Sequence, residues 1–125
     1  MLLVPTYVAP SAIEGLGLYA AQPIAKGTTI WRFDPLLDLI CPEGHLASYP
    51  PGTQDFLRKY GYVQRGTAGY RVLDGDNGRF MNHSEQANTD NRGESSFATR
   101  DIAAGEEITC DYAEFVEGFV PGQFE

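Results

Sequence analysis

The sequence predicts a single domain made mostly of short β-strands. The chain has 125 residues, a usual length for one domain, and 42% of them are hydrophobic, which is enough to form one core. Its 14 glycines and 8 prolines are spread along the whole length. Because these residues interrupt helices and begin turns, they favour strands joined by short loops.

Five segments are rich in β-branched and aromatic residues and are expected to form strands. In chain order they are 4–8, 28–33, 69–73, 95–99 and 107–112. The third ends at the turn-forming run Asp74-Gly-Asp-Asn-Gly78. The sequence has no internal repeat and no domain linker, so the strands are expected to belong to one unit.

Residues 53–60 have helical rather than strand periodicity. The apolar face of this helix would carry Phe56, Leu57 and Tyr60. Thr53 suits its N-cap, and Gly61 suits its C-terminal stop. One short helix is therefore expected between the second and third strands.

The negative charge is concentrated at one end of the chain. The formal net charge is −8, from 17 acidic and 9 basic residues. Residues 101–125 contain no base and the following acids: Asp101, Glu106, Glu107, Asp111, Glu114, Glu117 and Glu125. An acidic chain is a poor candidate for direct binding of nucleic acid, which requires clustered Lys and Arg. The acidic end is either a solvated, solubilising segment or a surface that attracts a cationic ligand.

The cysteines and the N-terminus suggest no metal, disulfide or membrane chemistry. Cys41 and Cys110 form no CxxC pair, and with two histidines in the chain we expect no metal site. The apolar residues 1–4 lack a basic flank and meet Pro5, so they are too short for a signal peptide. Without a long apolar run, we expect no membrane span and a cytoplasmic or otherwise intracellular location.

Three segments contain residues that could carry chemistry. Residues 14–20, EGLGLYA, lack the further residues of a phosphate loop, and their spacing alone favours a β-turn. Residues 82–84, Asn-His-Ser, could line a polar ligand site. His and Ser that are neighbours in sequence do not make a hydrolase triad. A polar turn, with a His whose hydrogen bonds are made within the protein, is the simpler interpretation. Residues 104–112 end in Tyr112, which by itself would be a packing residue.

Together and in this order, the three segments resemble the SET-domain family of protein lysine methyltransferases. The matching blocks are GLGLYA, RFMNHSEQANT and GEEITCDY. With the segments between them, the resemblance covers about residues 4–115, which is nearly the whole chain. The resemblance implies S-adenosylmethionine as cofactor and a basic, lysine-containing protein or histone-like tail as substrate. The lysine amine must be neutral to accept a methyl group, and a confined channel beside a cationic sulfonium would lower its pKa.

The resemblance also implies a fold. Several short curved sheets would surround a C-terminal pseudoknot, in which the Asn82-His83 segment passes beneath a loop near the catalytic strand. Residues 1–125 would form a single SET domain, with a variable insert at about 36–70 and a C-terminal flap at 114–125. The predicted helix falls inside this insert.

The roles implied by the family fall on matching residues of this chain. Tyr112 would be the catalytic residue, because its hydroxyl would orient the amine or the methyl group. The cofactor would be held by Gly15, Leu16, Gly17, Leu18, Arg79, Phe80, Asn82 and His83. The walls of the substrate channel would be formed by Cys110, Tyr60, Tyr62 and Tyr70.

Two departures from the family pattern affect the expected mechanism. Many relatives carry an aromatic residue where this chain has Cys110, and the smaller side chain leaves room for a di- or trimethylated amine. The cysteine-rich zinc segments that flank many histone-methylating relatives are absent from this sequence. A hydrophobic flap with Phe115, Phe119 and Phe124, or a second copy of the chain in a homodimer, would then close the site.

Three interpretations of the function stay open at this point. The preferred one is an active protein lysine methyltransferase. It would be located near nucleic acid only if its substrate is a nuclear or nucleoid protein. The alternative is a catalytically inactive SET-like module that binds a peptide or the cofactor. A third is a methyltransferase for small molecules or for residues other than lysine on the same scaffold. The presence of Tyr112, Asn82 and both glycines favours an active enzyme.

Overall fold

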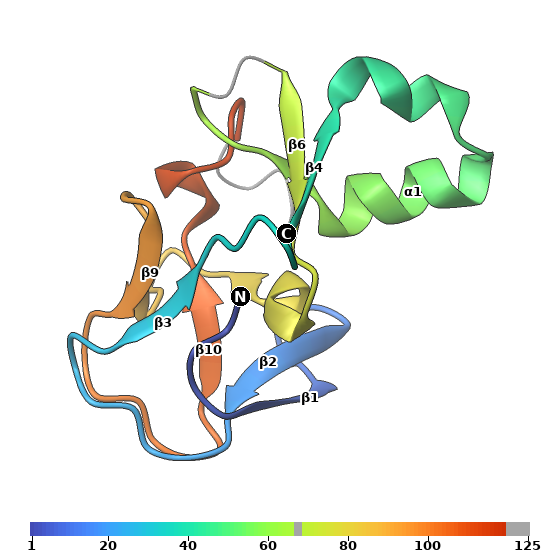
Figure 1. The fold of residues 1–125 in the computed structure, drawn as a ribbon. Coiled ribbons are helices and arrows are strands. Elements are labelled where there is room, and N and C mark those ends of the chain that lie inside the picture. The colour runs from blue at the N-terminus through green and yellow to red at the C-terminus, as the bar shows by residue number, and fades with distance from the viewer. Residues whose placement is uncertain (67–68, 120–125) are drawn as a thin grey trace.

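The computed structural model describes residues 1–66 and 69–119 (Figure 1). The strands are β1 (Thr6–Pro10), β2 (Leu16–Ala20), β3 (Thr29–Arg32), β4 (Leu39–Pro42), β5 (Tyr62–Val63), β6 (Tyr70–Leu73), β7 (Asn82–His83), β8 (Thr89–Asp90), β9 (Ser95–Ala98) and β10 (Glu107–Cys110). The helices are α1 (Pro51–Tyr60) and the 3-10 helices η1 (Glu43–Ser48), η2 (Asn77–Phe80) and η3 (Tyr112–Glu114). Within the described residues the strands form three small sheets, ordered β1-β2-β10-β7, β3-β9-β8 and β4-β6-β5. The predicted mostly β fold is confirmed.

The main hydrophobic core is shared by the first two sheets. Its most deeply buried large side chains are Leu18, Ile30, Ile102 and Ile108. Full burial of such a side chain contributes about 1.5 to 3 kcal/mol to folding. A smaller cluster, formed by Leu46, Leu57 and Leu73, joins α1 to the third sheet. The third sheet and α1 therefore have a core of their own beside the main one.

The five predicted strands are all present, with shifted ends. The first, β1, begins two residues later than expected, at Thr6. The last, β10, ends at Cys110 rather than Tyr112. Its end is set by Asp111, whose Oδ1 accepts a hydrogen bond from the backbone N–H of Ala113 at 3.0 Å and so caps η3.

The strand β2 corrects the β-turn that its spacing favoured. The turn lies earlier, where the N–H of Ser11 donates to the carbonyl oxygen of Gly15 at 2.8 Å. Gly15 has φ of +46°, a conformation that glycine adopts without strain. Residues 16–20 then pair with β1 on one side and with β10 on the other. Pairing on two sides overrides the local turn preference of the glycines.

The predicted helix is confirmed, but it begins earlier than expected. Pro50 is the N-cap and Pro51 the first helical residue, so Thr53 lies inside the first turn. The helix does end at Gly61, whose N–H donates to the carbonyl oxygen of Leu57 at 2.9 Å. A Cβ at this position would lie 2.6 Å from that oxygen. No helix in residues 1–66 or 69–119 is long and apolar enough to cross a membrane.

A parallel pairing of β7 with β10 joins two distant motifs of the sequence. Asn82 lies opposite Thr109, and His83 lies opposite Cys110. The buried Asn88 fixes the chain that follows β7, because its Oδ1 accepts from the Thr109 N–H at 2.9 Å and its Nδ2 donates to the Glu107 carbonyl oxygen at 2.8 Å. Strand order alone does not define a threaded connection, so the pseudoknot stays a prediction.

Candidate active site

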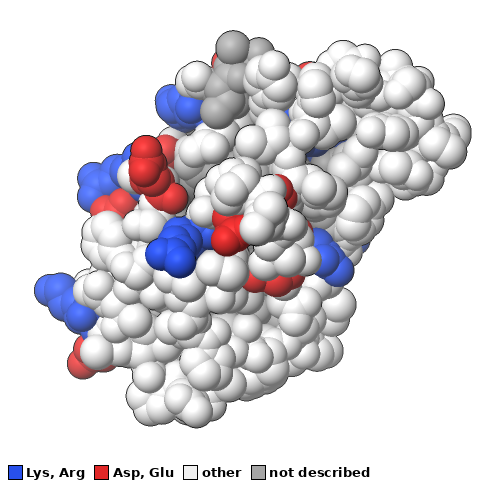
Figure 2. All heavy atoms as spheres, viewed as in Figure 1, with Lys and Arg blue, Asp and Glu red and all other residues white. Residues whose placement is uncertain are grey.

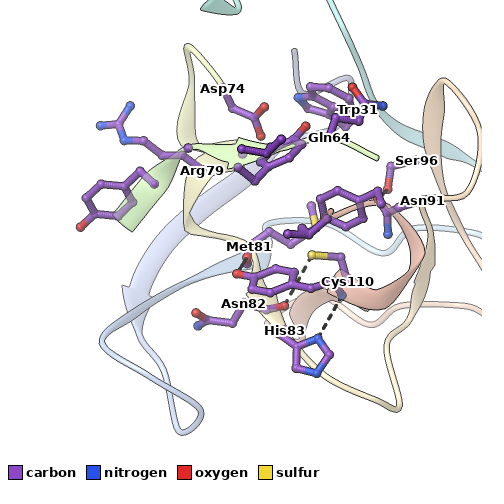
Figure 3. A pocket seen from close by; sticks show the side chains of 18 of the residues that line it. Trp31, Gln64, Asp74, Arg79, Met81, Asn82, His83, Asn91, Ser96 and Cys110 are labelled. Atoms are coloured by element: carbon purple, nitrogen blue, oxygen red, sulfur yellow. Dashed lines mark hydrogen bonds between the residues drawn. The ribbon is translucent and has the colours of Figure 1, made fainter. Parts of the chain in front are cut away.

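A cavity of about 1010 Å³ lies where β7, β10, β5 and the loop after η2 come together. Predicted site residues in its wall are Tyr60, Tyr62, Arg79, Asn82, His83, Cys110 and Tyr112. In the view of Figure 3, Asn82 and His83 lie at one end of this cavity, and Asp74 and Trp31 lie at the other. The two sequence motifs that contain Asn82 and Tyr112 therefore meet in one site.

The side chain of Asn82 ties three segments together. Its Nδ2 donates to the carbonyl oxygens of Glu14 and Leu16, each at 3.1 Å, and to Oε2 of Glu107 at 3.0 Å. Glu107 is itself held by the hydroxyl of Ser11, at 2.8 Å from Oε1. Within the described residues the Oδ1 of Asn82 accepts no hydrogen bond. Asn82 therefore anchors the glycine segment and keeps one acceptor for a ligand.

His83 is oriented by the backbone of the catalytic motif. Its Nδ1 accepts a hydrogen bond from the N–H of Tyr112 at 3.0 Å, which assigns the proton of the neutral ring to Nε2. That Nε2 is buried and has no partner among the described residues. The ring packs against those of Tyr112 and Phe119, with centroid distances of 5.1 and 4.8 Å. His83 thus offers a ligand an N–H donor from its side chain, and not only main-chain atoms.

Tyr112 lies in the cavity with its hydroxyl held in place. The hydroxyl donates to the carbonyl oxygen of Met81 at 3.3 Å. Burial raises the pKa of Tyr112 well above its ordinary value. The phenol therefore stays protonated at neutral pH and can orient a polar group, but it is a poor base.

Cys110 is a small, closely held residue of the cavity wall. Its side chain is 3% exposed, and its Sγ donates to the carbonyl oxygen of Asn82 at 3.8 Å. Burial raises the pKa of the Cys110 thiol, so it is neither a nucleophile nor a charge. Beside it Tyr62 packs edge-on against Phe115 at 5.0 Å between ring centroids. Burial also raises the pKa of Tyr62, which keeps that hydroxyl neutral.

The aromatic residues of the C-terminal segment contact the predicted site. Phe115 packs on Tyr62 and on Tyr112, and Phe119 packs on Tyr112 at 5.8 Å and on His83. The flap over residues 114–125 stays a prediction. Phe124 lies outside the described residues.

Several residues predicted to hold the cofactor do not line the cavity. The side chain of Leu18 is fully buried in the main core, so any contact with the cofactor would be made by its backbone. Within the glycine segment, the cavity is lined instead by Ile13 and Glu14. Gly17 has a different importance, because a Cβ there would lie 2.5 Å from Oε2 of Glu107. Its missing side chain leaves room for the carboxylate that holds Asn82.

The remaining predicted residues divide between the cavity and its surroundings. Phe80 supports the wall from behind, with the Tyr60 ring at 5.5 Å and the Arg79 guanidinium at 4.9 Å from its centroid. Tyr70, predicted as a channel wall, is 45% exposed and lines an adjoining cavity instead. It pairs with Pro42 at the edge strand β4, which carries it away from Tyr112.

Sequence reasoning missed the far end of the cavity, where Asp74 and Trp31 lie. The Oδ1 of Asp74 and the Nε1 of Trp31 are buried and have no hydrogen-bond partner among the described residues. Burial, and then the nearby Asp38 carboxylate, raise the pKa of Asp74 to about 7. The available signal was an acidic residue directly after the apolar end of a strand, which the sequence pattern assigned to a turn.

Asp74→Asn is expected to stabilise the protein at pH 8. The folded-state pKa of about 7 exceeds the ordinary value of 3.8, so ionisation of Asp74 weakens folding. This unfavourable contribution is absent below about pH 4 and complete above about pH 7, with an upper value of about 4 kcal/mol. Because asparagine keeps buried polar atoms, we expect a gain of about 1 to 3 kcal/mol in the free energy of unfolding at pH 8.

Urea unfolding at pH 8 and pH 4.5 measures this gain. It should be much smaller at pH 4.5, where the wild-type carboxyl is largely protonated in the folded state. The exposed Asp55→Asn is the matched control and should change stability at neither pH. An equal gain for Asp74→Asn at both pH values would contradict the raised pKa.

Comparison with known proteins identifies the family. A family model of the SET domain matches residues 15–113. The chain belongs to the SET-domain family. This match includes all three predicted motif segments, and it contains the β7–β10 pairing that builds the cavity. No curated protein matches the sequence at the level required for a relative.

Solved structures share the fold of this SET domain. A humanized mutant of the Chaetomium thermophilum Polycomb Repressive Complex 2 bound to the inhibitor GSK126 matches with 21% identity and a TM-score of 0.66, over 92% of this chain. The same kind of complex in an autoinhibited conformation, bound to S-adenosylmethionine, matches with 20% identity and a TM-score of 0.67 over 92% of this chain. This SET domain corresponds to 16% of each of those chains.

A Plasmodium falciparum protein described as a histone methyltransferase is similar in size as well as fold. It matches with 21% identity and a TM-score of 0.60, over 89% of this chain and 95% of that one. Identities at this level show a common fold. The activity of this SET domain has to be argued from its own residues.

Proposed function

We propose that this SET domain is an S-adenosylmethionine-dependent methyltransferase that acts on lysine in a basic protein. The observation that carries the proposal is the meeting of Asn82, His83, Cys110 and Tyr112 in one cavity through the β7–β10 pairing. Each of these residues presents a neutral group to the cavity, with no activated nucleophile among them. Such a site suits a reaction in which the transferred group is already bonded to a good leaving group, so that no nucleophile of the protein is needed.

The polar atoms at one end of the cavity fit the cofactor. The unpartnered Oδ1 of Asn82 can accept from the cofactor ammonium, and the orphaned Nε2–H of His83 can donate to a ring nitrogen or a hydroxyl. The buried Nε of Arg79 also has no partner in the described part of the chain, but in the view of Figure 3 Arg79 lies nearer Asp74 than His83. When bound, S-adenosylmethionine supplies a methyl group on a positively charged sulfur.

The residues around the reacting amine position it rather than react with it. Tyr112 offers a hydroxyl with a fixed direction, because the Met81 carbonyl holds it. The aromatic rings of Tyr62 and Phe115 restrict the path of an aliphatic side chain. Holding the amine in a partly desolvated channel favours its neutral form, and holding it close to the methyl group replaces a rare encounter in solution.

The acidic C-terminal residues contribute less to substrate attraction than their sequence suggests. Glu106 pairs with Arg100 at 2.6 Å, and Glu114 lies 3.5 Å from Arg92. Glu107 is occupied by Ser11 and Asn82. On the face shown in Figure 2, acidic and basic side chains are interspersed. A basic substrate would therefore be selected mainly inside the cavity.

Incubation with labelled S-adenosylmethionine and a panel of basic proteins tests the proposal. If wild type transfers the label to lysine, and substitution of cavity residues such as Tyr112 abolishes this transfer, the protein is a lysine methyltransferase. Cofactor binding by calorimetry without any transfer would instead support a catalytically inactive module. Label on a small molecule or on another residue type would assign the scaffold to a different methyl acceptor.

Cys110→Phe is expected to shift the product towards monomethyl-lysine. Cys110 lines the cavity, so a phenyl ring at this position would occupy space that the smaller thiol leaves to the amine. Mass spectrometry of a lysine peptide should show di- or trimethylated product for wild type and at least about tenfold less of it for the variant. Cys110→Ala serves as control and should retain the higher methylation states. An unchanged distribution in Cys110→Phe would remove Cys110 from the channel.

A further inference from the structure

The carboxyl group of Asp74 differs from the acidic residues around it. Asp38 accepts hydrogen bonds from the N–H groups of Gly75 and Asp34, at 2.9 and 2.8 Å. Asp76 accepts from those of Leu2 and Gly78, at 2.7 and 3.0 Å. Asp74 makes no hydrogen bond to any residue that the structure describes, and its Oδ1 is buried. The neighbours have structural roles, whereas Asp74 has none and lines the cavity.

The backbone leaves the Asp74 carboxyl group open to the cavity. A Cβ on Gly78 would lie 3.1 Å from Oδ2 of Asp74 and 3.4 Å from Cδ1 of Trp31. Because Gly78 has no side chain, this space stays available to a small polar group. The indole N–H of Trp31, also buried and without a partner among the described residues, offers that group a donor.

The ends of the cavity have different chemistry. The proposed cofactor contacts, Asn82 and His83, lie at one end, Cys110 lies nearer the middle, and Asp74 lies at the other end in the view of Figure 3. An amine attacking the methyl group must direct its lone pair towards the cofactor. Its N–H bonds then point away from the cofactor, so a proton acceptor is most useful at the opposite end.

We propose that Asp74 accepts the proton that the substrate ammonium must lose before methyl transfer. One N–H bond of the ammonium breaks, an O–H bond forms on the Asp74 carboxylate through water in the cavity, and the electron pair stays on nitrogen. Rotation about the Cε–Nζ bond then turns this pair towards the cofactor. The carboxylic acid returns the proton to solvent after the product leaves. The inference rests on the proposed function and assigns its missing base.

The electrostatic surroundings of Asp74 suit this role. The charged groups that act on it are the carboxylates of Asp38 and Asp76 and the N-terminal ammonium of Met1. Its own charge reaches the middle of the cavity, because it contributes to the raised pKa values of Tyr62 and Cys110. With its own pKa of about 7, Asp74 is ionised in half of the molecules near neutral pH. A base acts best when its pKa lies close to the working pH.

Single-turnover rates for two peptides test the proposal. One peptide carries lysine, and the other carries aminoethylcysteine, whose amine loses its proton more easily. For Asp74→Asn we expect a rate about 100-fold below wild type at pH 7 with the lysine peptide, and most of that loss recovered with the second peptide. Asp74→Glu should restore part of the rate, and the exposed Asp55→Asn should match wild type.

Binding of the lysine peptide to the cofactor-free protein is the independent measurement. Wild-type affinity should fall several-fold, roughly in proportion to protonation of Asp74, between pH 8 and pH 6, and Asp74→Asn should bind weakly at both. Equal slowing of both peptides, or an unchanged pH profile in an active Asp74→Asn protein, would overturn the role of Asp74 alone. Absence of transfer in wild type would overturn the proposed function and this role together.

Discussion

Tyr112→Phe is expected to lower methyl transfer about 100-fold or more. The substitution removes one hydroxyl, which is held by the Met81 carbonyl at 3.3 Å and stays protonated because burial raises the pKa of Tyr112. The ring remains and can still pack on His83 and Phe115. The amine would enter the same channel without its orienting group. Single-turnover transfer to a lysine peptide measures this loss.

Cofactor affinity separates this effect from a damaged site. Calorimetry should give a dissociation constant for Tyr112→Phe within about threefold of wild type, because no cofactor contact is removed. Tyr19→Phe is the matched control. It deletes a hydroxyl that donates to the Pro10 carbonyl at 2.7 Å, outside the cavity, and should leave transfer unchanged. Wild-type rates in Tyr112→Phe would refute its catalytic role.

Asn82→Asp is expected to destabilise the protein at neutral pH. In the wild type, Nδ2 of Asn82 donates to Oε2 of Glu107 and to the carbonyl oxygens of Glu14 and Leu16, all within 3.1 Å. In the variant, a carboxylate oxygen would take the place of this nitrogen and face the same three acceptors. Repulsion among these acceptors replaces the hydrogen bonds. Because these hydrogen bonds are exposed or only partly buried, we expect a loss of about 1 to 2 kcal/mol in the free energy of unfolding.

The loss of stability in Asn82→Asp should depend on pH. Repulsion from Glu107 would raise the pKa of the introduced carboxyl above its unfolded value, so the loss should be largest above that pKa and should shrink as the pH falls. Urea unfolding at pH 7.5 and pH 4.5 measures both values. The same substitution at the exposed Asn77 is the control and should change stability by less than about 0.5 kcal/mol. A fully stable Asn82→Asp protein at pH 7.5 would show that the three contacts do not hold the glycine segment.

The motifs predicted which segments meet at the cavity, but not which of their side chains line it. Tyr112, Asn82 and His83, which the family pattern brings together, all line the same cavity. Leu18 and Tyr70 do not line this cavity. Strand alternation put Leu18 into the core, and the register of β6 with β4 turned Tyr70 to an adjoining cavity. Sequence proximity to a motif did not predict which face a side chain takes.

By itself, the sequence determined the mostly β fold, five of the strands, the helix stop at Gly61 and the family, because these depend on local composition and on ordered motifs. Only the tertiary structure decided how the site is held together. Ser11 reaches Glu107 across 96 positions, and Asn82 reaches Glu107 across 25. Only folding brought Asp74 to the cavity as a carboxyl without a partner. Such contacts follow from long-range strand pairing, and no local pattern of residues records them.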